Sequence, residues 1–156
     1  MFKPHILALK GPSNTGKTTI IKRVRSKILG YFGDQATETD FLSKRATSDI
    51  KRIIEIGDFK IGIESQGDPV ARKKERSRLR ESLEFFDKEN CHVIITTSRT
   101  YGNTVDYIKA YEDKYEIKWY EKESESTELM ELGWENSANS IYDKVIELHA
   151  LYITNR

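Results

Sequence analysis

The stretch that decides the fold is HILALKGPSNTGKTTII, residues 5–21. A compact apolar run opens it and stops at Gly11, which is typical of a buried strand. From residue 17 to residue 29 the apolar side chains recur with helical spacing, and Gly30 stands where we expect that helix to end. A segment of small polar residues therefore lies between a predicted strand and a predicted helix.

The polar segment GPSNTGKT has the spacing Gly-x-x-x-x-Gly-Lys-[Ser/Thr], which is the Walker A pattern. Consecutive backbone N–H groups can wrap a phosphate only where bulky side chains are absent, and glycine allows the positive φ that such a loop needs. Lys17 is expected to reach the β- and γ-phosphates, and the Thr18 hydroxyl is the expected Mg²⁺ ligand. The helix that follows points its N-terminus at the anion. The residues assigned to nucleotide binding are Gly11, Ser13, Asn14, Thr15, Gly16, Lys17, Thr18 and Thr19.

By this motif and by its alternating strands and helices, the chain resembles the P-loop nucleoside triphosphatases. The resemblance implies a three-layer α/β/α sandwich, with residues 1–156 forming a single nucleotide-binding domain. It also implies Mg²⁺ and a nucleoside triphosphate. ATP is favoured over GTP, because the chain has no Asn-Lys-x-Asp run and no Asp-x-x-Gly after its second predicted strand.

The rest of the chain alternates strand-like and helix-like patterns, which predicts a mostly parallel sheet. Two β-branched runs flank Gly57-Asp58, a two-residue turn that predicts one hairpin arm. Residues 31–49 show no clear pattern and are expected to form a loop with a short helix. Further strands are predicted at 60–64, 91–97 and 116–123, and further helices at 67–90, 104–115 and 136–153.

An acid at the end of a second strand is the other feature expected of this class, and Glu64 is the candidate. Functional groups gather at the carboxyl ends of parallel strands, so Glu64 should face the phosphate-binding segment. The apolar run that leads to Glu64 is short and is broken by Gly62, and it ends in Glu where the usual pattern of this class has Asp. A role at the magnesium ion and a role as general base both stay open, as does a plain solvated strand end. Asp68 is either a helix N-cap or a catalytic acid.

Cations are concentrated in residues 69–80, which hold six basic side chains and one acid. This segment is either a solvated helix face or a flap whose arginines clamp phosphates. Arg99 follows a predicted buried strand, where its guanidinium can stabilise γ-phosphate charge or stack on adenine. A surface arginine with neither role is the alternative. Lys17, Glu64 and Arg99 are therefore the candidate catalytic residues.

Composition limits the setting in which such a protein works. The net charge of +1 gives no general attraction to nucleic acid, and no apolar run is long enough to span a membrane. The single cysteine, Cys91, opens an apolar run and is expected to be buried. With no secretory signal recognised in the first residues, a cytoplasmic location is expected.

The predicted activity is transfer of the γ-phosphate of Mg-ATP to a small acceptor, as in nucleoside and nucleotide kinases. Two alternatives remain open at this point. One is a regulatory ATPase that controls a protein or nucleic-acid partner, and the other is a nucleotide-binding module with little turnover. The sequence identifies neither the acceptor nor the oligomeric state.

Overall fold

A computed structural model describes residues 2–12, 16–42, 49–66, 78–100, 102–122 and 127–155 of the chain. Six strands form one sheet in the order β2-β3-β4-β5-β1-β6. The strands are β1 (His5–Lys10), β2 (Ala36–Asp40), β3 (Lys51–Ile56), β4 (Phe59–Glu64), β5 (Val93–Ser98) and β6 (Glu116–Glu121). The helices are α1 (Lys17–Phe32), α2 (Arg78–Lys88), α3 (Asn103–Lys109) and α4 (Thr127–Thr154).

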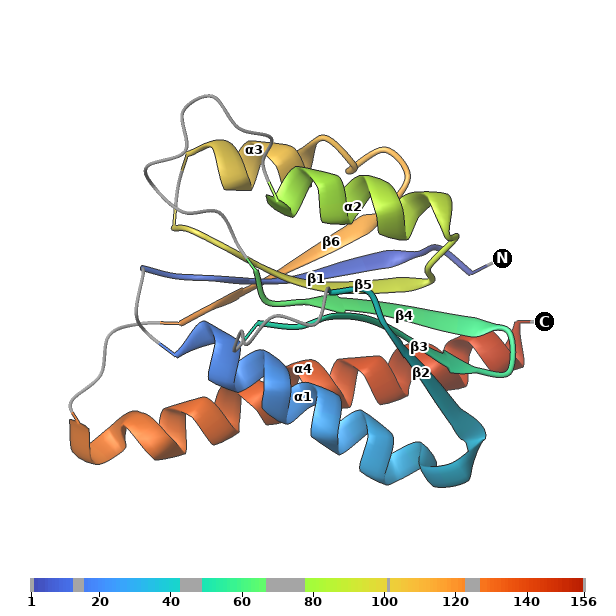
Figure 1. The fold of residues 1–156 in the computed structure, drawn as a ribbon, viewed down its shortest axis with the longest axis horizontal. Coiled ribbons are helices and arrows are strands. Elements are labelled where there is room, and N and C mark those ends of the chain that lie inside the picture. The colour runs from blue at the N-terminus through green and yellow to red at the C-terminus, as the bar shows by residue number, and fades with distance from the viewer. Residues whose placement is uncertain are drawn as a thin grey trace.

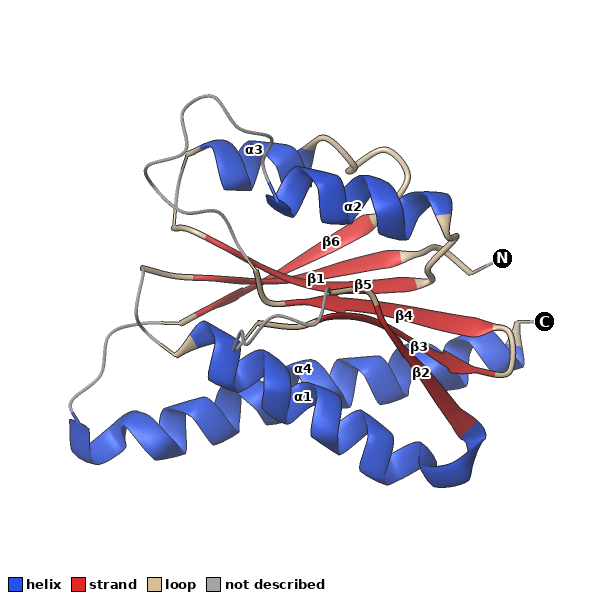
Figure 2. Ribbon diagram, viewed as in Figure 1, coloured by secondary structure: helices blue, strands red, loops and turns tan. Residues whose placement is uncertain are grey.

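Helices cover both faces of the sheet, which confirms the predicted three-layer α/β/α architecture. Helices α1 and α4 lie against one face, and α2 and α3 lie against the other (Figures 1 and 2). Strand β1 is buried from both sides, because Leu7 and Leu9 pack with α1 and α4 whereas Ile6 and Ala8 pack with α2 and α3. The alternation of side chains along one strand therefore supplies two separate cores.

The sheet is mostly parallel, as predicted. Strand β1 pairs in parallel with β5 and β6, and β4 pairs in parallel with β5. Strand β3 is antiparallel to both β2 and β4. The predicted hairpin is confirmed, since Ile56 pairs with Phe59 across a turn in which Gly57 has φ of 61°.

The expectation for residues 31–49 was wrong in its described part. After a 3₁₀ turn at Gly33–Gln35, residues Ala36–Asp40 form the edge strand β2. Its sequence, ATETD, carries no apolar alternation. Pairing with β3, and not burial of apolar side chains, therefore accounts for this strand. Glu38 adds to this pairing, because it accepts hydrogen bonds from Arg25 of α1 and Arg52 of β3.

Three helix boundaries also differ from the prediction. Helix α1 continues through Gly30 to Phe32, whose ring is buried, and ends where Gly33 takes φ of 55°. Helix α3 ends at Lys109, before the predicted limit at residue 115. Helix α4 begins at Thr127 and so includes much of the acidic stretch that precedes the predicted start at residue 136.

Gly62 explains why the apolar run of β4 is interrupted. A Cβ atom at this position would lie 2.6 Å from the ring of Phe86 on α2. The missing side chain lets α2 approach the sheet closely, so Gly62 serves the packing of this layer. The buried face of α2 includes Leu79, Leu83 and Phe86.

Candidate active site at the ends of β1 and β5

The carboxyl ends of β1 and β5 lie side by side at one edge of the sheet. The two strands are parallel neighbours, with Lys10 opposite Ser98. The chain leaves β1 into α1 on one face of the sheet and leaves β5 toward α3 on the other (Figure 1). Connections that diverge in this way open a crevice at the strand ends, which is the usual ligand site of open α/β sheets.

Lys17 lies at these strand ends, in the first turn of α1. Its Nζ donates hydrogen bonds to Gly11 O at 2.6 Å and Ser98 O at 2.8 Å, and thus bridges the ends of β1 and β5. Burial lowers the pKa of Lys17 to about 8, and the nearby charge of Arg99 acts in the same direction. Burial and the charge of Arg99 thus both disfavour the charged form of Lys17.

The two glycines of the motif are each required by a specific neighbour. Gly16 has φ of 87°, and a Cβ atom there would lie 2.2 Å from Nε1 of Trp134 on α4. At Gly11 a Cβ atom would lie 2.5 Å from the backbone oxygen of Lys122. Sequence reasoning assigned both glycines to the loop but missed the contact with Trp134, since residue 134 is far away in the chain.

Arg99 follows β5 directly, at the same edge as Lys17. Its backbone N–H donates a hydrogen bond to Thr104 Oγ1 at 3.0 Å, which fixes the turn into α3. The charge of Arg99 contributes to the lowered pKa of Lys17, so the two cations are close enough to repel each other. The structure therefore brings together two of the three predicted catalytic residues, and both are cationic.

Glu64 lies at the carboxyl end of β4, one strand farther from β1 than Arg99 does. The residue is completely buried, so it is not a solvated strand end. Thr96 Oγ1 donates a hydrogen bond to its Oε1, and the Gln66 backbone N–H donates to its Oε2 at 2.8 Å. Both carboxylate oxygens are therefore engaged by neighbouring protein groups.

Asp49 is an acid at this edge that sequence reasoning missed. The Thr18 hydroxyl donates to its Oδ1 at 3.5 Å, and the Ser65 hydroxyl donates to the same oxygen at 3.4 Å. Asp49 lies just before β3, in a stretch without a motif, so no sequence pattern could connect it with Thr18. The contact arises because the turn after β4 and the entry to β3 meet beside α1.

Several predicted residues lie outside the described part of the chain. These are Ser13, Asn14, Thr15, Asp68 and the first part of the basic segment, residues 69–77. Two of its arginines are described. Arg78 donates to the Gln66 backbone oxygen at 3.3 Å, and Arg80 pairs with Glu84 at 3.4 Å along α2.

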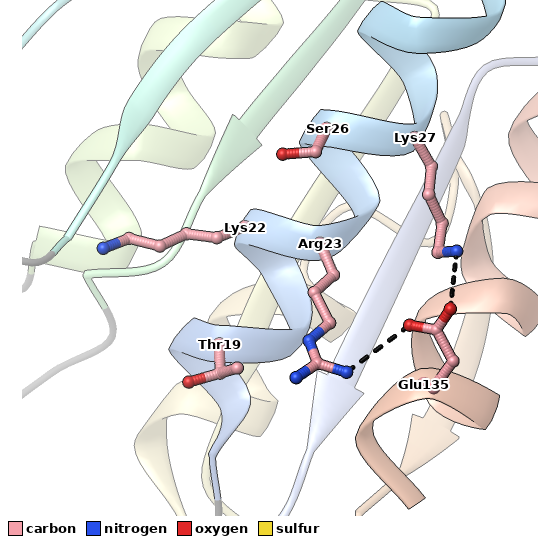
Figure 3. A pocket seen from close by; sticks show the side chains of 6 residues that line it. All are labelled: Thr19, Lys22, Arg23, Ser26, Lys27 and Glu135. Carbon is pink, nitrogen blue, oxygen red and sulfur yellow. Dashed lines mark hydrogen bonds and ion pairs between the residues drawn. The ribbon is translucent and has the colours of Figure 1, made fainter. Parts of the chain in front are cut away.

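A shallow pocket of about 430 Å³ begins beside the site and follows α1. Five residues of α1 line it together with Glu135 of α4 (Figure 3): Thr19, Lys22, Arg23, Ser26 and Lys27. Glu135 pairs with Arg23 at 3.4 Å and with Lys27 at 2.9 Å. These pairs hold α4 against α1 and so keep Trp134 beside Gly16.

Comparison with known proteins adds little to this geometry. No family model matches the chain, and no curated protein matches it. Among solved structures, the crystal structure of APE1195 aligns over 94% of this chain and 73% of its own, with 16% identity and a TM-score of 0.39. A similarity at this level supports no conclusion about function. No helix in the described ranges combines the length and the apolar character that crossing a membrane requires.

Proposed function

We propose that this protein is a P-loop phosphotransferase, which binds ATP with Mg²⁺ at residues 11–19 and transfers the γ-phosphate to a small acceptor. The observation that carries the proposal is the placement of Lys17. Its Nζ lies between Gly11 O and Ser98 O, at the crevice between β1 and β5 and at the start of a helix. A strand end, a left-handed glycine, a lysine and a helix N-terminus in this order form an anion site.

The chemistry of the neighbouring groups fits a magnesium ion. Mg²⁺ prefers oxygen ligands, and it commonly binds through one or two carboxylates together with substrate phosphates. A hydroxyl and a carboxylate stand side by side here, on Thr18 and Asp49. When bound, the ion supplies positive charge that offsets the negative charge of the phosphates.

Each cation has its own part in this proposal. Lys17 exchanges its two carbonyl partners for phosphate oxygens, which are stronger acceptors because they are charged. Arg99 adds a second positive charge at the same edge, where it stabilises charge on the transferring group. Backbone N–H groups of the segment and the N-terminus of α1 complete the positive surroundings.

The experiment that tests the proposal compares ATP consumption by the purified protein alone and with a panel of nucleosides, nucleotides and other small metabolites. A phosphotransferase consumes ATP slowly alone and rapidly with one acceptor, and Arg99→Ala reduces that rate much more than it reduces stability. Rapid hydrolysis that responds to a protein or nucleic acid, with no effect of any small acceptor, would contradict it.

A further inference from the structure

We infer that Asp49, and not Glu64, is the acid that shares the magnesium ion with Thr18. This inference rests on the proposed function and assigns one more residue to the same site. It differs from the sequence-based expectation, in which Glu64 was the acid. Its basis is the place of each carboxylate, since Asp49 contacts Thr18 whereas Glu64 is buried against Thr96 and Gln66.

Asp49 is held beside α1 by a connected set of hydrogen bonds through Ser65. The Ser65 hydroxyl donates to Asp49 Oδ1 at 3.4 Å and accepts a hydrogen bond from the Ile50 backbone N–H at 2.8 Å. The Ser65 backbone N–H in turn donates to Ile50 O at 2.9 Å. Ser65 itself is buried and is hydrogen-bonded to the backbone of Ile50, so the contact places the carboxylate of Asp49 beside an ordered part of the sheet.

The spacing of Thr18 and Asp49 suits a shared cation. Their oxygens lie 3.5 Å apart, which is long for an O–H···O hydrogen bond. Adjacent ligands of an octahedral Mg²⁺ ion lie about 3 Å apart, since each is about 2.1 Å from the metal. The two oxygens therefore need to move only a little to bind the same ion.

Glu64 is in a different situation. It is completely buried, and hydrogen bonds from Thr96 and Gln66 occupy its two oxygens. To reach a metal beside Thr18 it would have to leave at least one of these partners without an acceptor in the interior, which is costly. Its hydrogen bonds instead join the ends of β4 and β5, so we assign it to positioning the crevice.

The experiment measures the affinity of AMP-PNP, a non-hydrolysable ATP analogue, by calorimetry in excess Mg²⁺ and in EDTA. Titration of Mg²⁺ into the protein–AMP-PNP complex gives the apparent metal affinity. The variants are Asp49→Asn and Glu64→Gln, with Asp34→Asn as the control. Asp34 is exposed in the turn after α1, and its substitution removes the same charge away from the site.

We expect Asp49→Asn to lower the apparent metal affinity about tenfold or more, and to leave the affinity in EDTA within about twofold. Asp34→Asn should keep the metal affinity of the wild type, and Glu64→Gln should lower that affinity less than Asp49→Asn does. Unchanged metal affinity in Asp49→Asn, an equal loss of its affinity in EDTA, or a loss in Glu64→Gln as large as in Asp49→Asn would each overturn the inference. If the wild type binds no AMP-PNP in either buffer, the proposed function fails and the inference falls with it.

Discussion

Gly16 is constrained both by its backbone conformation and by a neighbouring side chain. It takes a left-handed conformation, and Trp134 fills the space where a side chain would stand. We predict that Gly16→Ala lowers the free energy of unfolding by more than the roughly 1–2 kcal/mol expected for left-handed strain alone, because Trp134 must also move. Gly57→Ala is the matched control, since Gly57 also has positive φ but no atom lies within 4 Å of the place its Cβ would take. Urea unfolding measures both, and equal losses would contradict the role of Trp134.

The charge of Lys17 predicts how anion binding depends on pH. Its pKa of about 8 means that the ammonium is lost as the pH rises above 8. Between pH 7 and pH 9.5 the affinity for ADP should therefore fall roughly tenfold or more in the wild type, and remain nearly constant in Lys17→Arg. Arg99→Ala should move the fall to higher pH, because the charge of Arg99 helps to lower the pKa of Lys17. Calorimetric titrations across this range provide the test.

The same lowered pKa makes stability rise with pH, whereas it makes the affinity for ADP fall. The unfolded chain keeps the ordinary lysine pKa of 10.5, so between about pH 8 and pH 10.5 the unfolded state binds more protons than the folded state. The contribution of Lys17 to stability is therefore unfavourable below pH 8 and is relieved as the pH rises. A loss of ADP affinity over that range thus cannot come from a weaker fold at Lys17.

Two glycines inside elements, Gly62 in β4 and Gly30 in α1, should respond to alanine in opposite directions. Gly62→Ala places a methyl group against the ring of Phe86, and such overpacking costs about 1–3 kcal/mol. Gly30→Ala adds a methyl group where no atom lies within 4 Å, and it should stabilise α1 by about 0.5–1 kcal/mol. Thermal and urea unfolding distinguish the two signs. A stabilising Gly62→Ala would show that α2 does not pack on β4 as described.

The edge strand β2 depends on Glu38, which has an ionised partner on each side. Burial acts to raise the pKa of Glu38, but the hydrogen bonds and charges of Arg25 and Arg52 lower it overall. We predict that Glu38→Gln costs about 1–3 kcal/mol at neutral pH. Because the folded-state pKa lies below 4.5, this stabilisation is present above pH 4.5 and is lost as the pH falls through the lower value. The wild type and the variant should therefore converge in acid, and a constant difference in urea unfolding would contradict the charge-based account.

At the level of elements, the sequence predicted best where burial shapes the pattern. Strands β1, β4 and β5 are apolar because helices cover both of their faces, and the hairpin at Gly57-Asp58 has a local turn signal. Strand β2 could not be predicted, since pairing and Glu38 hold it with no apolar pattern to mark it. The early start of α4 was missed because acids alternate with the apolar residues of its first turns, and Leu129 and Leu132 are exposed instead of buried in the core.

For the site, the residues within one short segment were predictable from the sequence, and the contacts between residues far apart in the chain were not. Gly11, Gly16, Lys17 and Thr18 follow from spacing within one segment. The edge position of Arg99 follows from its place after a buried strand. The contacts of Asp49 with Thr18 and of Trp134 with Gly16 join residues separated by many positions, so only the three-dimensional arrangement reveals them. The burial of Glu64 is of the same kind, since its partner Thr96 belongs to the neighbouring strand.

At the level of the whole molecule, a sheet covered by helices on both faces carries Lys17 and Arg99 where the connections from β1 and β5 diverge. Each of the described helices has a part in it: α1 carries Lys17 and Thr18, α4 places Trp134, α3 closes the turn after Arg99, and α2 packs on Gly62. Under the proposed function, a nucleotide that binds only the folded chain should stabilise it by RT ln(1 + [L]/Kd), where [L] is the free nucleotide concentration.

The most direct test of this central claim is a calorimetric titration of AMP-PNP with Mg²⁺ into the wild type and into Lys17→Ala. The wild type should bind one AMP-PNP molecule per chain. Lys17→Ala should bind AMP-PNP more weakly by roughly tenfold or more, since charge-assisted hydrogen bonds to phosphate contribute about 1.5–3 kcal/mol. The unfolding transition of Lys17→Ala should stay cooperative, which separates loss of the ligand contact from loss of the fold. Equal affinity in the two proteins would contradict the account.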